Sequence, residues 1–566
     1  MVRLFRTWAL PFIVVMSGGA VFAQQSLSPS RPAPDDLYLD SATHKRSRAL
    51  AHFAVGVLRQ QQPSATSDDY VRHYQKALEL IPDSDVLLDV LIRPLLAERK
   101  FNAVSDALAP VAAAHPEQTR LVLVLCETLV LQERRDEAIQ ILERSLKATH
   151  WKDPRLVREL AIYYSRSNRF DAVQKLFERA LKREHLRRSF VVHQAAALFY
   201  YSRANNAEEA AAAEDDRLRA FSHVRRTVDH IDEAERLEDV DSLAQILRDA
   251  EKWELLAALL EKARHRPQVS AVSLDLMLAE ALFELNRDQD AVKILEEVEY
   301  FADLSPSSIF RLGHLYVRAD ELVSAATAYE RLLERVPDNE RLRLTLASLY
   351  LRMDDPRKAI RVLEGCECED LRAEKYYYLS HAYRALDQFE KAARMLARVE
   401  DEAPPGHALF DTGFFMYYST LAEKLGYIDR AIKMARKARQ KAPDDPDTAN
   451  FLGYFLADHN RKLNEAEELI HSAVESEPEN VAFLDSLAWV YYRQKRYRAA
   501  LRPILKAIRL SAGSPDPVIL DHAGDICLRN GLSLLAYRYW WHALQTGAQD
   551  KDAVREKLKK HPIPSS

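Results

Sequence analysis

The sequence has 566 residues with a formal net charge of −5, and 48% of the residues are hydrophobic. Only 13 of the 566 residues are glycine, which is about 2%, whereas glycine usually makes up about 7% of a protein. Nucleotide-binding α/β enzymes need glycine in their tight turns and phosphate loops, so this composition argues against that class. The slightly acidic balance also gives no basic surface for nucleic acid or anionic membranes. Composition therefore favours a soluble, helix-rich protein.

Residues 1–23 have the pattern of a bacterial export signal. Arg3 and Arg6 give it a positive start, an apolar core follows, and small residues precede a cleavage site after Ala23. No cysteine follows the core, so the pattern is not that of a lipoprotein. The alternative is an uncleaved membrane anchor, which Pro11 and the short apolar run argue against. We expect a periplasmic or secreted protein with no membrane span after signal cleavage.

A disordered lead-in is predicted for residues 24–46, which contain many Ser, Pro and Asp residues. Beyond it, a pattern with a period near 34 residues runs through the chain. In its clearest copy, Gly313 and Tyr316 share one face of a first predicted helix, and Ala325 and Tyr329 share one face of a second. The same residue types recur in the next two copies at Ala347, Tyr350, Ala359 and Leu363, and at Ser380, Tyr383, Ala392 and Leu396.

These residues resemble the tetratricopeptide repeat (TPR) family, in which a small residue stands where two helices cross and an aromatic residue follows one turn later. Gly or Ala at the crossing lets the two helices approach closely, and larger residues fill the space between repeats. The resemblance covers most of the chain. It implies an all-α protein, a right-handed α-solenoid of about twelve or thirteen helix-turn-helix repeats.

Breaks in the pattern divide the chain into segments. The predicted segments are N-terminal repeats at 47–186, an atypical helical segment at 187–236, central repeats at 237–402, C-terminal repeats at 403–546 and a tail at 547–566. In the atypical segment, an insertion at 203–217 is expected to interrupt the second helix of its pair. One extra residue near Asn460 is expected to lengthen a turn between helices, and 550–560 is predicted to be a capping helix.

Signals for catalysis or metal binding are scarce. The sequence contains no glycine-rich phosphate loop, G-x-S-x-G, H-E-x-x-H or paired C-x-x-C. Cys366 and Cys368 have no neighbouring ligands for a closed zinc site, and Cys368 is expected to be exposed. Cys126, Cys366 and Cys527 stand at packing positions of the repeat, where cysteine acts as a small apolar residue. We therefore predict no enzymatic activity, no cofactor and no metal.

The concave face of a solenoid is formed mainly by the first helix of each repeat, and it is where partners are expected to bind. In the central repeats this face is predicted to carry a basic and aromatic stripe, made of Arg311, His314, Arg318, Arg341, Arg352, Tyr377, Tyr378, His381 and Arg384. Arginine with tyrosine is typical of protein interfaces, and the stripe predicts an acidic or carboxylate-terminated peptide as ligand. The alternative is a solvated helix face with incidental arginines.

The last repeats are predicted to present aromatic side chains edged with carboxylates on the same face. The residues are Tyr417, Asn450, Tyr454, Asp485, Trp489, Tyr492, Asp521 and Asp525. This groove suits an extended apolar or basic segment, although packing between repeats is an equally good explanation of its aromatic residues. The lysine of the carboxylate clamp found in chaperone-binding members of the family is not reproduced.

Two functions follow from these surfaces. The first is a non-enzymatic scaffold of the bacterial cell envelope that holds protein or peptide partners on its concave face. Similar exported solenoids imply roles in envelope complex assembly, secretion or polysaccharide export. The alternative is a carbohydrate-binding or glycan-processing accessory, in which Tyr454, Trp489 and Tyr492 stack on sugars while Asp485 and Asp521 accept hydrogen bonds from hydroxyl groups. A hydrolytic version would need two carboxylates about 5–10 Å apart.

Overall fold

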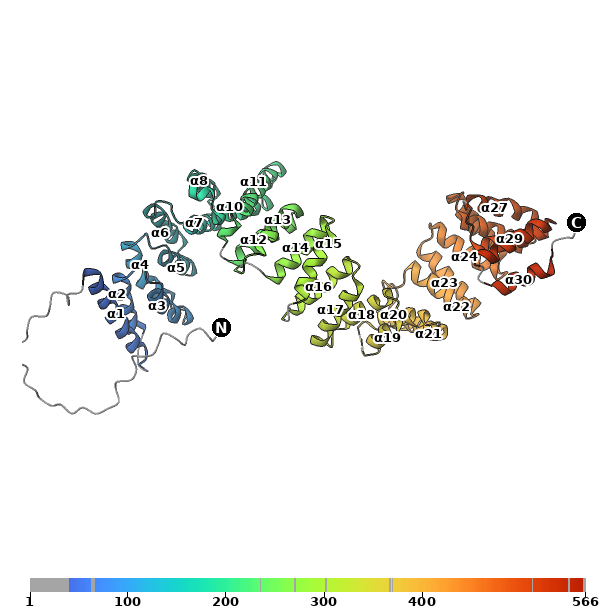
Figure 1. Ribbon diagram of the computed structural model, residues 1–566, viewed down its shortest axis with the longest axis horizontal. Helices are drawn as coiled ribbons and strands as arrows, with labels where there is room; N and C mark the ends of the chain where they lie inside the picture. Colours follow the sequence, from blue (N-terminus) through green and yellow to red (C-terminus); the bar gives the residue numbers. More distant parts are fainter. Residues whose placement is uncertain are drawn as a thin grey trace, which may run out of the picture. The chain divides into compact units, whose positions relative to one another are not determined.

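The computed structural model is a series of helices, and no strand occurs among the residues it describes (Figure 1). These residues are 40–62, 67–234, 236–268, 271–300, 303–365, 368, 370–511, 513–547 and 550–562. The predicted export signal at 1–23 and Cys366 lie outside the described residues. The predicted disordered lead-in at 24–46 extends too far along the chain, because the first helix begins at Ser41.

The chain divides into two compact units, with the boundary in the sequence between residues 270 and 271. The helices of the first unit are α1 (Ser41–Gln60), α2 (Ser67–Leu80), α3 (Asp85–Ala97), α4 (Phe101–Ala114), α5 (Thr119–Leu131), α6 (Arg135–Ala148), α7 (Pro154–Arg166), α8 (Phe170–Leu181), α9 (Glu184–Arg187), α10 (Phe190–Asn205), α11 (Ala210–Asp229), α12 (Leu237–Asp249) and α13 (Trp253–Ala263).

The second unit contains the C-terminal repeats and the part of the central repeats that follows residue 270. Its helices are α14 (Val272–Glu284), α15 (Asp288–Glu299), α16 (Pro306–Arg318), α17 (Leu322–Arg335), α18 (Glu340–Arg352), α19 (Pro356–Glu364), α20 (Arg372–Ala385), α21 (Phe389–Glu402), α22 (Thr412–Lys424), α23 (Ile428–Lys441), α24 (Pro446–Asp458), α25 (Leu463–Ser476), α26 (Val481–Arg493), α27 (Tyr497–Leu510), α28 (Pro517–Arg529), α29 (Ser533–Thr546) and α30 (Lys551–Lys560).

The helices pack in consecutive pairs, from α1 with α2 to α28 with α29. We call the first helix of each pair its A helix and the second its B helix. In the described chain thirteen pairs coincide with the predicted repeats, and α10 with α11 forms a fourteenth. The all-α helical-repeat fold predicted from the sequence is therefore confirmed.

Local sequence signals explain where the A helices begin and end. Asn339 and Asp411 accept hydrogen bonds from backbone N–H groups in the first turns of α18 and α22, and so cap both helices. Several turns after the A helices contain a residue with left-handed backbone, such as Asn286 with φ 56° and Asp320 with φ 59°. Asn and Asp tolerate this conformation better than most residues, which lets the chain reverse direction without glycine.

The small residues of the repeat stand where an A helix crosses its B helix. A Cβ atom added at Gly313 on α16 would lie 2.5 Å from Cε1 of Tyr329 on α17, closer than carbon atoms approach. Ala347 occupies the matching position on α18 and is fully buried. The ring of Tyr329 is also buried, so the aromatic residue of the B helix fills the space that the small residue leaves.

The atypical segment contains a helical pair of its own. Helix α10 runs through Arg203 as far as Asn205, and α11 begins at Ala210, so the insertion expected at 203–217 is almost entirely helical. The prediction that it interrupts a helix was wrong. Arg203 pairs with Asp216, Nε to Oδ2 at 2.5 Å, and thereby joins the end of α10 to α11. The alanine-rich sequence from 210 onward favours helix, which explains the outcome.

The turn between α24 and α25 is longer than its counterparts, as predicted. It contains two residues with left-handed backbone, Asn460 with φ 52° and Lys462 with φ 41°. The corresponding turn between α16 and α17 contains only Asp320 in this conformation. The predicted capping helix near the C-terminal end is confirmed as α30.

Candidate functional site

The predicted residues of the concave face all lie on A helices of the second unit, from α16 to α28. Consecutive A helices pack against one another, as α14 does with α16, α18 with α20 and α24 with α26. Side chains at matching positions of neighbouring A helices therefore share one side of the unit. We call this side the A-helix face.

Arginines of the predicted basic stripe pair with carboxylates one repeat earlier on the A-helix face. Arg318 Nη1 lies 2.7 Å from Glu284 Oε1, and Arg311 Nη2 lies 3.5 Å from Glu280 Oε2. The side chains of Arg318 and Glu284 are each 37% exposed. Ion pairs this exposed contribute at most about 1 kcal/mol, because water screens them well. A carboxylate of another molecule can therefore replace Glu284 or Glu280 at little energetic cost.

Other cations of the stripe are still more accessible. Arg352 is half exposed and lies 3.1 Å from Asp320, which is itself 82% exposed. Arg341 and His314 are also exposed, and neither forms an ion pair within the described part of the chain. The A-helix face from α16 to α18 thus carries arginines that are weakly held or free.

The aromatic end of the stripe is a packed cluster that joins α20 to α22. The imidazole of His381 stacks on Tyr417 with 4.4 Å between ring centroids, and Tyr377 meets His381 edge-on at 4.6 Å. The guanidinium of Arg384 lies 5.7 Å from the centre of the Tyr417 ring. Burial, together with the charge of Arg384, lowers the pKa of His381 to about 4, so this histidine is neutral at pH 7.

Two polar atoms of the predicted site are buried without a hydrogen-bond partner among the described residues. They are His381 Nε2 on α20 and Asn450 Oδ1 on α24. Such atoms are destabilising until they find a partner, and they are uncommon in folded proteins. Both lie on A helices of the predicted partner-binding surface.

Trp489 is the centre of a second aromatic cluster on the A-helix face. Its indole stacks on His522 with 3.9 Å between centroids and on Tyr492 with 5.0 Å between centroids. Its Nε1–H donates a hydrogen bond of 3.0 Å to Asp458 Oδ1. Only 7% of Trp489 is exposed. Tyr454 lies beside this cluster, 6.4 Å from the ring of His522.

A buried ion pair supports this aromatic cluster. His522 Nδ1 lies 3.0 Å from both carboxylate oxygens of Asp485, and both residues are 6% exposed. Burial opposes a charge on His522, but the attraction of Asp485 and of two further aspartates outweighs it and raises the pKa of His522. The sequence analysis did not single out His522. The repeat register was the available signal, because it places position 522 beside position 485 of the preceding A helix.

The remaining predicted groove carboxylates are occupied by the last helix. Lys557 Nζ of α30 lies 2.8 Å from Asp521 Oδ1 and 2.8 Å from an oxygen of Asp525. Asp525 also accepts a hydrogen bond of 3.1 Å from Trp540 Nε1. Asp485, Asp521 and Trp489 thus already interact with other side chains of the protein. The contacts that the carbohydrate alternative requires of these side chains are already made internally.

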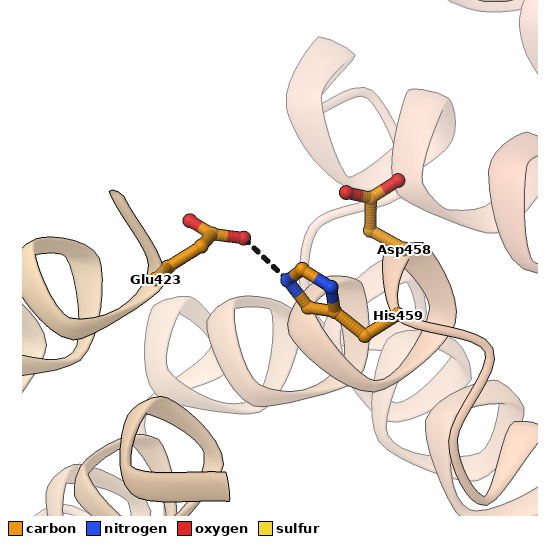
Figure 2. Close-up of side chains that lie close together, drawn as sticks. All are labelled: Glu423, Asp458 and His459. Carbon is orange, nitrogen blue, oxygen red and sulfur yellow. Dashed lines mark hydrogen bonds and ion pairs between the residues drawn. The ribbon is translucent and has the colours of Figure 1, made fainter. Parts of the chain in front are cut away.

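A further group of polar side chains lies at the ends of α22 and α24 (Figure 2). Glu423, Asp458 and His459 each offer one ligand atom, and these atoms lie within 4.8 Å of one another. His459 Nε2 is 2.7 Å from Glu423 Oε1. The sequence analysis found no metal cluster here, because the residues of the two helices are about one repeat apart in the sequence.

The first unit has a cleft of about 790 Å³ between α7, α10 and α12. Its apolar lining includes Phe170 and Phe199. Three arginines also line it, and each pairs with a carboxylate: Arg158 and Arg236 with Asp239, and Arg203 with Asp216. Arg203 lies over the ring of Phe199 at 5.2 Å. Pockets of this volume are common binding places for small groups, and the aromatic lining of this one suits an apolar side chain.

The three cysteines within the described residues are buried. Cys126 and Cys527 are free thiols that are fully buried, and burial raises their pKa values to about 12 and about 11. The predicted packing role of these two residues is confirmed. Cys368 is also fully buried and is disulfide-bonded, so the prediction that it is exposed was wrong.

The packed helix pairs define a helical-repeat protein. Within the described residues, no helix is both long and apolar enough to cross a membrane. Residues 311–466 and 457–515 match two models of the tetratricopeptide repeat. This part of the chain, residues 311–515, therefore consists of tetratricopeptide repeats.

The comparisons also identify a bacterial relative and similar structures. The TPR repeat-containing protein PA4667 of Pseudomonas aeruginosa is 29% identical over 220 residues. That alignment covers 38% of this chain and 35% of the relative, so the chain spans about a third of that relative's length.

Three solved structures illustrate the structural similarity. A tetratricopeptide repeat protein from Parabacteroides merdae is 16% identical, with 45% of this chain and 97% of that chain covered and a TM-score of 0.36. The APC/C hetero-tetramer Cut9–Hcn1 is 14% identical, with 91% and 99% covered and a TM-score of 0.34. YrrB, a TPR protein with an unusual peptide-binding site, is 18% identical, with 33% and 94% covered and a TM-score of 0.30.

Proposed function

We propose that this protein is a non-enzymatic scaffold of the bacterial cell envelope that binds acidic segments of partner proteins on its A-helix face. One observation carries the proposal: Arg311, Arg318 and Arg352 project from neighbouring A helices, and their ion pairs in the described chain are with surface carboxylates of the preceding repeat. Arg318 also lies over the ring of Phe283 at 5.2 Å. An acidic segment that binds along this face would form ion pairs with these arginines in place of the weak pairs within the protein. Arg341, which has no such pair in the described chain, would add a contact.

The mechanism follows from the rigidity of the repeats. Because the arginines are fixed on packed helices, little conformational entropy of the scaffold is lost when a partner binds. Many weak contacts along several repeats then add together. Guanidinium groups suit this role, since each can form two parallel hydrogen bonds with a carboxylate.

The proposed location rests on two observations. The sequence of residues 1–23 has the features of an export signal, and Cys368 is disulfide-bonded. Disulfides persist in oxidising compartments outside the cytosol. Fractionation of cells that express the full chain tests the location. We expect the mature protein in the periplasmic or extracellular fraction, and a variant in which Arg3 and Arg6 are both replaced by Glu is expected to accumulate inside the cell.

The binding function is tested by cross-linking in intact cells followed by purification of the protein with its partners. The test variant combines Arg311→Glu, Arg318→Glu and Arg352→Glu. The matched control combines Arg357→Glu, Arg361→Glu and Arg394→Glu, three exposed arginines of the B helices that give the same change in charge.

We expect a partner that is recovered with the wild type and with the control to disappear with the test variant. Circular dichroism should give the same helicity for all three proteins. The proposal is wrong if the test variant retains every partner of the wild type, or if the control loses the same partners.

A further inference from the structure

The group at the ends of α22 and α24 combines two carboxylates with an imidazole. Figure 2 shows the carboxylate of Glu423 facing the ring of His459 across the gap between the two helices, with Asp458 beside His459 on the same turn of α24. One ligand atom from each residue lies within 4.8 Å of the others, and the His459 to Glu423 contact measures 2.7 Å. All three side chains are partly exposed, so ions have access from solvent.

The charge of this group is not balanced by a nearby cationic side chain. In the described part of the chain, neither Glu423 nor Asp458 forms an ion pair with a lysine or arginine. The neighbouring cations face aromatic rings instead: Lys424 Nζ lies 4.0 Å from the ring centre of Phe389, and Arg493 lies over Trp489 at 5.7 Å. Elsewhere on the A-helix face an arginine meets the carboxylate of the preceding repeat.

Asp458 is also held in place from outside the group. Trp489 Nε1–H donates to Asp458 Oδ1 at 3.0 Å, and the indole is itself fixed between stacked rings. A hydrogen bond of this kind orients a metal-binding carboxylate and leaves its second oxygen available for a ligand bond.

From this arrangement we propose that Glu423, Asp458 and His459 bind one divalent transition-metal ion, with Zn²⁺ as the representative ion. Imidazole nitrogen and carboxylate oxygen suit Zn²⁺ at bond lengths of about 2.0–2.2 Å, whereas Mg²⁺ and Ca²⁺ prefer sites made only of oxygen. Ligand atoms around such an ion lie at most about 4.4 Å apart, so small side-chain rotations complete the site. Water or a group of a partner fills the remaining positions. The proposal goes beyond the scaffold function and does not depend on it.

The site is tested by titrating Zn²⁺ into the untagged full-length protein in an isothermal calorimeter. The informative variant is His459→Arg. An arginine can still donate a hydrogen bond to Glu423, as Arg318 does to Glu284, but it is not a metal ligand, so we expect the fold to be preserved while the site is removed. His265→Ala is the control, because His265 is an exposed histidine of the first unit.

We expect one zinc ion per chain to bind the wild type and the His265→Ala control equally. His459→Arg should weaken this binding at least about tenfold, the effect that even outer-sphere changes have at metal sites. Mg²⁺ should produce no comparable heat. The proposal is overturned if the wild type binds no zinc, or if His459→Arg binds it as tightly as the wild type.

A second variant and a spectroscopic signal distinguish the loss of the metal site from misfolding. Asp458→Asn retains an oxygen that accepts the Trp489 hydrogen bond but removes the charge of the ligand. With Co²⁺ as the probe, we expect a visible absorption band from the wild type that both Asp458→Asn and His459→Arg lose, while circular dichroism stays the same. A band that survives in both folded variants assigns the ion to another place and contradicts the proposal.

Discussion

Gly524 lies directly against the indole of Trp540, where helix α28 crosses α29. A Cβ atom at position 524 would be 2.3 Å from Trp540 Nε1, an approach that no side chain tolerates. The same Nε1–H donates a hydrogen bond to Asp525, so the ring is held from two sides. A contact this close fixes both the distance between the two helices and the orientation of the ring.

Gly524→Ala is therefore expected to destabilise the last repeats by about 1–3 kcal/mol, the usual effect of overpacking a core. Urea unfolding followed by tryptophan fluorescence measures the change. Gly413→Ala is the control, because a Cβ atom there would meet only Asp411, at an ordinary distance of 3.4 Å. Equal stability of the two variants would show that the crossing has room for a methyl group.

A buried pair of histidines in the atypical segment makes its stability depend on pH. His193 Nε2 faces the carbonyl oxygen of Arg187 at 2.8 Å and must carry the proton, so its Nδ1 accepts from His223 Nδ1–H, also at 2.8 Å. Burial and the neighbouring His193 lower the pKa of His223 to about 4, and burial lowers the pKa of His193 as well.

Folding lowers the pKa values of both histidines. Their contribution to the stability of the folded state is therefore complete above the pKa of an unfolded histidine, about 6.5, and is lost as pH falls towards 4. Each histidine contributes at most about 1.4 kcal/mol per pH unit in that window. Hydrogen exchange of α10 and α11 between pH 7.5 and pH 4.5 should show falling protection. His223→Gln should flatten the dependence, and an unchanged slope in that variant would contradict the assignment.

Lys557 neutralises two partly buried carboxylates, and its loss should release the last helix. Burial alone would lower the pKa of Lys557, but Asp525 and Asp521 raise it, so the ammonium stays charged at neutral pH. Lys557→Met leaves both carboxylates without their partner, and we expect a destabilisation of about 1–3 kcal/mol. Limited proteolysis should cut near α30 sooner than in the wild type. Lys559→Met, at an exposed position of the same helix, should digest like the wild type.

The exposed ion pairs between repeats are expected to contribute little to stability. Arg318→Glu places a second carboxylate beside Glu284, and adding Glu284→Arg restores a pair of opposite sign. We expect each variant to unfold within about 1 kcal/mol of the wild type, because the side chains are well solvated. Thermal unfolding checks this directly. A much larger loss for Arg318→Glu alone would mean that the pair is structural and does not exchange with partner carboxylates.

Most of the fold could be predicted because the repeat pattern reports packing. The residue types of Gly313 and Tyr329 recur at fixed spacing because two helices must pack closely together in every repeat. The atypical segment was harder to predict, because α11 is rich in charged and alanine residues and lacks the repeat pattern. Its helical propensity, rather than its periodicity, was the informative signal.

The candidate site was less predictable than the fold. A single sequence shows that Arg318 lies on the A-helix face, but its pairing with Glu284 depends on how side chains of two repeats meet. His459 was missed for a related reason. Glu423 lies in the last turn of α22 and His459 directly follows α24, so the two residues meet at a separation of 36 positions instead of the repeat period of 34. Irregularities of this kind are visible only when the helices are placed in space.

The contacts between neighbouring repeats also govern how the chain acquires its structure. Arg318 pairs with a residue 34 positions earlier and Trp489 with one 31 positions earlier. A repeat can therefore complete its packing as soon as the next one has emerged, without waiting for a distant segment. Folding can accordingly proceed in step with synthesis or with passage across a membrane, and an interrupted chain keeps the repeats it has already formed.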